Sequence, residues 1–176
     1  PASAAAGPVS DDDTLKIVMK HKDDPRTMVM IKNIPYSYTE AELLDEFRTY
    51  GALTSVDPHA EAEFDWIHMP VDGRRCKGYA FMNFIDTNHL FFFYAKMNRH
   101  VWVIHQDAGG HQTAGQRRRC VVTYARIQGK QAMIQRFQNS SLLAESLEVQ
   151  PRLFVSHGVD KGKPERFPGG AELPIE

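Results

Sequence analysis

A strict alternation runs through residues 77–84, Lys-Gly-Tyr-Ala-Phe-Met-Asn-Phe. Successive side chains of a strand point to opposite faces, so this run predicts a half-buried strand. Its two faces hold Ala80, Met82 and Phe84 on one side and Tyr79, Phe81 and Asn83 on the other. The first face suits a hydrophobic core. The rings of the second face are expected to contact a partner outside the strand, because burying aromatic surface is favourable. The alternative is a core strand that is aromatic on both of its faces.

Hydrophobic periodicity also predicts the elements on either side of this strand. Thr39 and Glu42 form a capping box that begins a helix, and Asp86 caps a second helix. The predicted strands are 27–34, 64–69, 77–84 and 120–125, with a short one at 101–104, and a third helix spans 130–143. The order strand, helix, strand, strand, helix, strand predicts an α+β ferredoxin-like fold. Four antiparallel strands would be backed by two helices, with an additional C-terminal helix.

Composition divides the chain into a central domain and two ends. Residues 1–24 are expected to be a flexible N-terminal tail, 25–143 the domain with its C-terminal helix, and 144–176 a tail that can pack on the domain. The formal net charge is −1. The central part is mildly basic and both ends are acidic, which gives weak support for a nucleic-acid partner. The chain begins with Pro1, so we expect a fragment or a processed form.

Several classes of function are disfavoured by what the sequence lacks. No apolar run approaches the roughly 18 residues of a membrane span, and the two cysteines are interpreted as reduced thiols. The histidines show no short metal-ligand spacing with cysteine. No constellation of catalytic residues is visible. We therefore expect no enzyme, no cofactor, no metal and no membrane association, and we expect this fragment to be a monomer.

The octamer fits the signature K/R-G-F/Y-G/A-F-V-x-F/Y of the RNA recognition motif, with Met82 in place of Val. Rings on such a sheet stack on bases of single-stranded nucleic acid at roughly 1–3 kcal/mol per base. Residues 29–34 fit the companion motif of the first strand, but Met30 stands where a ring is usual. Tyr36 or Tyr38 could replace that ring, or both could only pack in the loop.

The chain also resembles one particular family. The runs 124–132 (Tyr-Ala-Arg-Ile-Gln-Gly-Lys-Gln-Ala) and 137–142 (Phe-Gln-Asn-Ser-Ser-Leu) are similar to the C-terminal RNA recognition motif of the Mei-two-like proteins. The resemblance continues at 24–35, 152–154 and 167–168. It implies single-stranded RNA binding, and a regulator of meiosis or development that acts post-transcriptionally in the nucleus, the cytoplasm or both. It also implies a parent protein with further such domains upstream.

Predicted RNA contacts follow from the expected outer face of the sheet. Tyr79 and Phe81 would stack, Lys32 and Lys77 would meet phosphates, and the last strand and its exit would supply base-edge contacts. The full set is Met30, Lys32, Trp66, His68, Lys77, Tyr79, Phe81, Arg117, Arg118, Arg119, Thr123, Arg126 and Gln128. Three alternatives stay open: Trp66 could belong to the core, Gln128 could cap a helix, and residues 117–119 could be a solvated loop end.

The main alternative function is a protein-interaction domain that binds a partner peptide through its helical side or its C-terminal helix. Some splicing-factor domains hold a partner tryptophan with an Arg-x-Phe turn, and this chain has His100-Val101-Trp102 at the matching place. The third helix decides how much of the sheet is open. We expect it to dock on the helical side, because an apolar stripe on the sheet would bury lysines.

Overall fold

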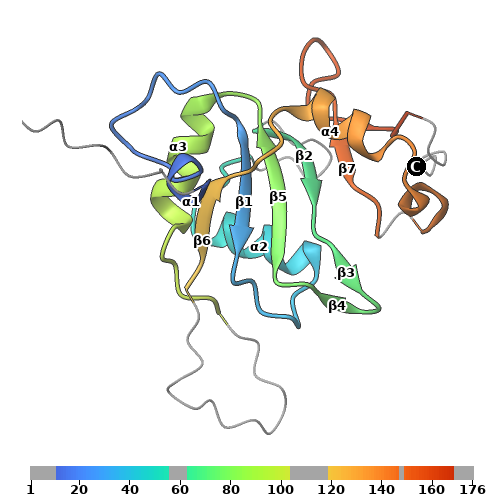
Figure 1. Cartoon of the computed structure of the whole chain (residues 1–176), viewed down its shortest axis with the longest axis horizontal. Helices are drawn as coiled ribbons and strands as arrows, with labels where there is room; N and C mark the ends of the chain where they lie inside the picture. Colours follow the sequence, from blue (N-terminus) through green and yellow to red (C-terminus); the bar gives the residue numbers. More distant parts are fainter. Residues whose placement is uncertain (1–10, 56–62, 104–118, 147–148, 169–176) are drawn as a thin grey trace, which may run out of the picture.

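The computed structural model describes residues 11–55, 63–103, 119–146 and 149–168. Its elements are α1 (Asp11–Thr14), β1 (Met28–Lys32), α2 (Glu40–Thr49), β2 (Phe64–His68), β3 (Val71–Asp72), β4 (Arg75–Cys76), β5 (Tyr79–Phe84), α3 (Thr87–Met97), β6 (Val121–Tyr124), α4 (Lys130–Phe137), a 3-10 helix (Ser141–Ala144), β7 (Arg152–Phe154) and β8 (Pro164–Glu165). Figure 1 shows their arrangement.

One sheet organises the fold, with strand order β6-β1-β5-β2-β7-β8. All its pairs are antiparallel. The first four strands are those of the predicted α+β ferredoxin-like fold, which is confirmed. The last two come from the C-terminal segment and extend the sheet beyond β2. At 101–104 the expected strand reduces, within the described residues, to a single bridge between Val101 and Arg119.

Helices α2 and α3 cover one face of the sheet, which we call the inner face (Figure 1). The predicted capping box at Thr39 and Glu42 is present at the start of α2. Phe47 of α2 and Phe93 of α3 pack edge to face, with ring centroids 4.9 Å apart. The inner core also takes the alternating side chains of the central strands, namely Val29, Ile31, Ala80, Met82 and Phe84. The predicted division of the octamer into two faces is therefore correct.

The segment before β1 packs on the domain from about Leu15 onward. Ile17 is only 3% exposed and belongs to the inner core. The Tyr124 amide donates to the Leu15 carbonyl at 2.8 Å, and the Arg26 guanidinium lies 3.8 Å from the Tyr124 ring centroid. Leu15 and Ile17 therefore pack on the domain beside β6, although they fall within the flexible tail expected at 1–24, whereas residues 19–23 are exposed. Residues 1–10 lie outside the described residues.

Helix α4 lies on the other face of the sheet, the outer face, over the β2 side (Figure 1). Met133 and Ile134 are buried there with Trp66 of β2, Leu153 of β7 and Phe167. The prediction that this helix docks on the inner, helical side is wrong. That prediction assumes that a helix lying on the sheet would bury Lys32 and Lys77. Helix α4 instead covers the apolar part of the face and leaves both lysines at least partly exposed.

Candidate nucleic-acid interface

Among the described residues, the outer face keeps an open region on β6, β1 and β5. We call it the open platform, and it consists of Met30, Lys32, Tyr79, Phe81 and Thr123, all half-buried. Strand register places them together, since Lys32 is opposite Tyr79 and Met30 lies between Phe81 and Thr123. The rings of Tyr79 and Phe81 have centroids 5.7 Å apart at an interplanar angle of 79°. This edge-to-face contact holds each ring in place while part of it stays exposed.

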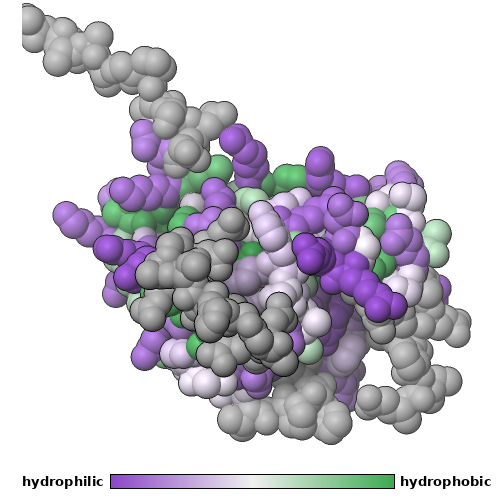
Figure 2. Space-filling view, turned by 90° about the horizontal axis from the view of Figure 1, so that it is seen from below, coloured by the Kyte–Doolittle hydropathy of each residue, from purple (hydrophilic) through white to green (hydrophobic). Residues whose placement is uncertain are grey.

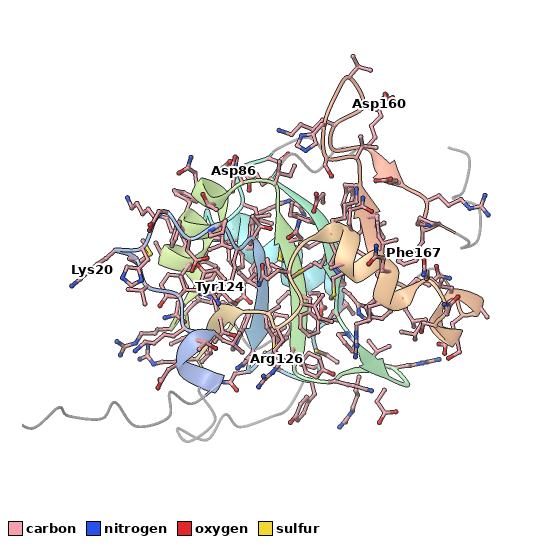
Figure 3. All side chains as sticks on the ribbon, turned by 45° about the horizontal axis from the view of Figure 1, so that its top comes forward. Lys20, Asp86, Tyr124, Arg126, Asp160 and Phe167 are labelled. Atoms are coloured by element: carbon pink, nitrogen blue, oxygen red, sulfur yellow. The ribbon has the colours of Figure 1, made fainter. Side chains whose placement is uncertain are left out.

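The outer face of β2 is covered, which corrects two predicted RNA contacts. Trp66 and His68 do face outward, but their exposed fractions are 0% and 4%. The Phe137 ring of α4 lies over both, at 5.7 Å from Trp66 and 5.2 Å from His68. Phe167 adds a second covering ring 5.9 Å from Trp66, beside α4 (Figure 3). Neither side chain is therefore available to a base in this arrangement.

Burial also removes the charge of His68. Desolvation lowers its pKa to about 4, and the nearby charge of Lys77 acts in the same direction. A group whose pKa is lowered on folding binds fewer protons in the folded than in the unfolded state between the two pKa values. The imidazole is therefore neutral near pH 7 and destabilises the fold only below about pH 6.5. It cannot act as a cation for a phosphate at neutral pH.

Gln128 has a structural role in place of the predicted base-edge contact. Its Nε2 donates to the carbonyls of Met28 and Ala125 at 2.9 and 2.8 Å. Its Oε1 accepts from the amides of Thr27 and Met28 at 3.0 and 2.9 Å. All of its hydrogen-bonding capacity is thus used within the protein. The alternative that Gln128 caps a helix is not observed either, since α4 has no side-chain cap hydrogen bond at its start and the main partner of Gln128 is the start of β1.

A chain of polar contacts fixes the C-terminal segment at the end of the sheet where Gln128 lies. Asn83 Nδ2 donates to Asp65 Oδ1 at 2.7 Å, and Ser156 Oγ donates to Asp65 Oδ2 at 2.7 Å. Lys130, at the start of α4, donates to Ser156 Oγ at 3.2 Å and to the Phe154 carbonyl at 2.7 Å, and it pairs with Glu165. The complete chain is Thr27, Asn83, Asp65, Ser156, Lys130 and Glu165.

Sequence reasoning missed this polar chain, because its members are spread over the whole domain. The only local signal was Lys130, which follows Gly129 inside one of the family-specific runs. A lysine that is 9% exposed must have partners to be tolerated there. Because the buried ammonium is paired and hydrogen-bonded, α4 is tied to β7 and β8 as well as packed on β2.

The predicted cations lie in different surroundings. Lys77 and Arg126 are exposed, and Lys32 is half-buried on the open platform. Arg119 is exposed next to β6, and its Nη1 donates to the Arg99 carbonyl at 3.0 Å. Arg117 and Arg118 lie outside the described residues. The Thr123 hydroxyl oxygen is itself buried and finds no hydrogen-bond partner among the described residues, and its contact with a base stays a prediction.

The two tyrosines after β1 have different surroundings. Tyr38 is 3% exposed and donates its hydroxyl hydrogen bond to the Val103 carbonyl. Tyr36 is 50% exposed and its ring lies against Gly78. A Cβ at Gly78 would lie 3.1 Å from Tyr36 Cε1, and the backbone there has φ +94°. Glycine at this motif position therefore permits the close approach of a third, exposed ring near Tyr79.

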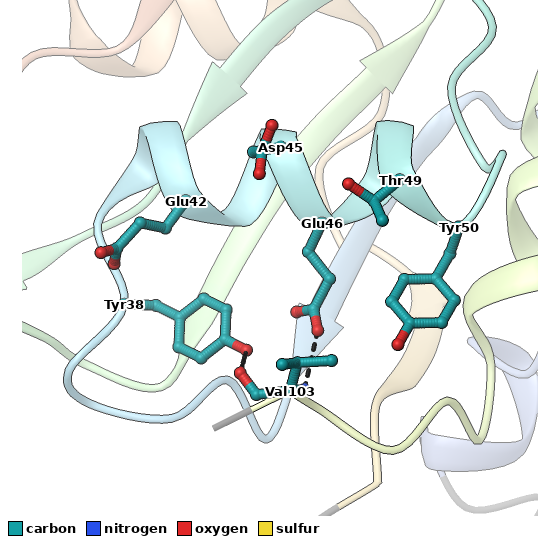
Figure 4. A pocket seen from close by; sticks show the side chains of 7 residues that line it. All are labelled: Tyr38, Glu42, Asp45, Glu46, Thr49, Tyr50 and Val103. Carbon is teal, nitrogen blue, oxygen red and sulfur yellow. Dashed lines mark hydrogen bonds between the residues drawn. The ribbon is translucent and has the colours of Figure 1, made fainter. Parts of the chain in front are cut away.

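A hollow of about 290 Å³ opens on the helical side, away from the platform (Figure 4). It is lined by Tyr38, Glu42, Asp45, Glu46, Thr49, Tyr50 and Val103. Its three carboxylates would repel RNA phosphates. Trp102, at the place compared with an Arg-x-Phe turn, is 4% exposed and packs on Tyr38 with centroids 5.7 Å apart. It belongs to the core.

Within the described residues, no helix is long and apolar enough to span a membrane. No three His, Cys, Asp or Glu side chains in that part of the chain are grouped so that they could hold a metal ion. Cys76 and Cys120 are buried free thiols, and burial raises the pKa of both. Such thiols are unreactive in the neutral range.

Comparison with known proteins places the chain in a family. The family model for RNA recognition motif 2 matches residues 26–138. The chain belongs to this family. The Mei2-like resemblance is also confirmed: Protein MEI2-like 4 of Oryza sativa subsp. japonica is 37% identical over 153 residues, which are 86% of this chain and 14% of that protein. Meiosis protein mei2 of Schizosaccharomyces pombe is 34% identical over 148 residues, 82% of this chain and 17% of that protein.

The chain therefore spans only a small part of these Mei2-like relatives. Among solved structures it is similar to "Structure of Rna15 RRM with bound RNA (GU)", with a TM-score of 0.41, 20% identity, 65% of this chain covered and 100% of the other. The matched segment 26–138 of the RNA recognition motif 2 family ends just after α4. The strands β7 and β8 lie beyond it.

Proposed function

We propose that this RNA recognition motif 2 domain binds single-stranded RNA through the open platform. The observation that carries the proposal is the pair Tyr79 and Phe81, which remain partly exposed side by side on the outer face. Two stacked bases would occupy these rings, and Lys32, directly opposite Tyr79, would contact the backbone phosphates. Trp66 and His68, which α4 covers, and Gln128, whose hydrogen-bonding groups are used within the protein, would make no direct contact with RNA.

The first prediction tests the two rings. Tyr79→Ala and Phe81→Ala should each weaken binding of single-stranded RNA by roughly 1–3 kcal/mol, because each removes one stacking surface. Binding is measured by fluorescence anisotropy with labelled oligouridylate at a stated salt concentration. Phe92→Ala is the matched control, because Phe92 is exposed at 46% on α3, on the other side of the sheet. Wild-type affinity in a folded Tyr79/Phe81 double variant would refute the proposal.

We infer further that the parent protein is a post-transcriptional regulator of meiosis or development without catalytic activity. The names of the relatives Protein MEI2-like 4 and Meiosis protein mei2 support this reading. This domain is monomeric. The parent protein acts in the nucleus, the cytoplasm or both. Crosslinking of the parent protein to RNA in cells, followed by sequencing, checks it. An absence of crosslinked RNA at Tyr79 and Phe81 would count against the inference.

A further inference from the structure

The hollow beside α2 gathers negative charge on one face of this helix. Asp45 and Glu46 lie three and four residues after Glu42, so the three carboxylates share a face of α2, where like charges repel each other. The described lining of the hollow contains these three carboxylates and no lysine or arginine. A cation is therefore the ligand whose charge this lining favours.

Glu46 is the buried carboxylate of this face. It is 7% exposed, and its Oε1 accepts from the Val103 amide at 2.7 Å, with His100 Nε2 at 3.4 Å. The other oxygen, Oε2, is buried and accepts no hydrogen bond from the described residues. Figure 4 shows this carboxylate between the rings of Tyr38 and Tyr50. A buried carboxylate oxygen without a donor is costly, so a donor that enters the hollow is favoured.

Tyr38, the other buried side chain of the hollow, does not supply this donor. Burial and the neighbouring Glu46 carboxylate raise the pKa of the Tyr38 hydroxyl, so the hydroxyl keeps its single proton. That proton is donated to the Val103 carbonyl. Glu46 Oε2 is thus left for a donor from outside.

Several kinds of ligand do not suit the hollow. Its carboxylates repel RNA phosphates, and the described residues include no group of side chains that could hold a metal ion. In the view from below, hydrophilic side chains cover most of the described surface and hydrophobic ones form small separate areas (Figure 2), which disfavours the docking of an apolar peptide on that side. An organic cation remains.

The rim and the size of the hollow suit a flat cation on a long stem. Tyr50 is 45% exposed at the rim, and its ring centroid lies 4.3 Å from that of His100, which supports it. A guanidinium group stacks on aromatic rings and donates to carboxylates in its plane. The volume of about 290 Å³ lies at the lower limit of roughly 300–1,000 Å³ for small-molecule sites, so the hollow fits one long side chain.

We propose that the hollow binds an arginine side chain of a partner protein. The guanidinium donates to Glu46 Oε2 and stacks on the Tyr50 ring, and Asp45 adds negative charge at the rim. A small movement of the exposed Tyr50 side chain admits the guanidinium to the buried oxygen. Because the hollow is on the helical side and the open platform is on the outer face, the partner and RNA can be bound together.

The test is an NMR titration of the isotope-labelled chain with a heptapeptide of glycine and serine that carries one arginine. Two comparison peptides carry citrulline, which is neutral, or lysine in place of the arginine. We expect saturable shifts of the Tyr50 and Val103 amide signals with the arginine peptide. The citrulline peptide should bind about tenfold more weakly, because it cannot make charge-assisted hydrogen bonds. The lysine peptide, which cannot stack in the same way, should bind several-fold more weakly.

Glu46→Gln keeps the size of the side chain and an acceptor for the Val103 amide but removes the charge. It should weaken the arginine peptide about tenfold. Asp45→Asn, at an exposed position of α2, should weaken it several-fold and replaces Glu46→Gln in the test if that variant unfolds. Asp23→Asn, which removes an exposed acid of the segment before β1, is the matched control and should bind as the wild type does.

Equal binding of the arginine and citrulline peptides overturns the proposal, and so does wild-type binding by the folded Glu46→Gln or, in its place, Asp45→Asn. A loss in Asp23→Asn as large as the loss in Glu46→Gln shows an effect of net charge alone and overturns it as well. Equal binding of the lysine peptide overturns the assignment to arginine. Nonauridylate, an RNA of nine uridines, should leave the peptide bound, and its displacement of the peptide would overturn the assignment to the hollow.

Discussion

Gln128 shows how a single side chain can join two elements that are about a hundred positions apart. It bonds the amides of Thr27 and Met28 and the carbonyls of Met28 and Ala125. An amide side chain can both donate and accept, so it continues the hydrogen bonding of β1 beyond the end of β6. Asn83 does the same between Thr27 and Asp65. Both residues hold the end of the platform where β5 finishes.

Gln128→Ala should therefore reduce stability and leave the RNA contacts themselves intact. It leaves backbone groups of β1 without partners, and each unpaired buried group costs about 1–3 kcal/mol. Chemical denaturation measures the decrease, and RNA affinity is measured where the variant is fully folded. Gln131→Ala, at an exposed position of α4, is the control and should change little. If the Gln128→Ala protein has normal stability but binds RNA more weakly, Gln128 contacts RNA directly.

Helix α4 is a fixed part of the outer face. It has 8 residues, too few to be stable alone in water. Its order comes from Met133 and Ile134 on the β2 side and from Lys130. Displacing α4 would expose its apolar side chains to water. The Lys130 ammonium would also lose its hydrogen-bond partners. We therefore expect the helix to stay in place when RNA binds.

The chain contains a reporter for this expectation, because Trp66 lies directly under Phe137 of α4. Its fluorescence should remain blue-shifted and shielded from acrylamide at saturating nonauridylate. The only other tryptophan, Trp102, is in the inner core, so Trp66→Phe identifies which signal belongs to Trp66. A red shift or increased quenching on RNA binding, absent in Trp66→Phe, would show that α4 opens like a lid.

The whole molecule is a domain whose sheet is completed by its C-terminal segment. β7 pairs with β2 and β8 pairs with β7, so β2 is an interior strand. Leu153 and Phe154 are each 2% exposed and Phe167 is 4% exposed. Leu153 and Phe167 belong to the outer cluster under α4, whereas Phe154 belongs to the inner core. The segment therefore contributes to both cores.

A chain that ends after Leu143, the domain boundary expected from the sequence, should be much less stable than one that ends after Pro168. The truncation removes Leu153, Phe154 and Phe167, whose buried apolar side chains are each worth about 1.5–3 kcal/mol, and the β2 edge becomes exposed to intermolecular pairing. Thermal unfolding and sedimentation of the two forms compare them. If both forms sediment as monomers and melt at the same temperature, residues 144–168 are dispensable and the boundary at 143 is adequate.

The local patterns of the sequence determined the inner half of this protein. Alternation in 77–84 fixed which residues of β5 face the helices, because a strand exposes its faces with a period of two. The capping residues Thr39 and Asp86 fixed where α2 and α3 begin. The motif also placed Tyr79 and Phe81 on the outer face. These features depend on neighbours close in sequence, so they can be read without the fold.

Only the tertiary structure decided which part of the outer face is open. The direction of Trp66 and His68 followed from alternation, but their burial depends on α4 and Phe167, which arrive from far along the chain. The cost of burying lysines argued against a helix on this face, yet Lys130 is buried there because β7 and β8 supply its partners. Contacts between distant segments have no periodicity along the sequence, so the position of α4 and the role of Gln128 became visible only in the assembled fold.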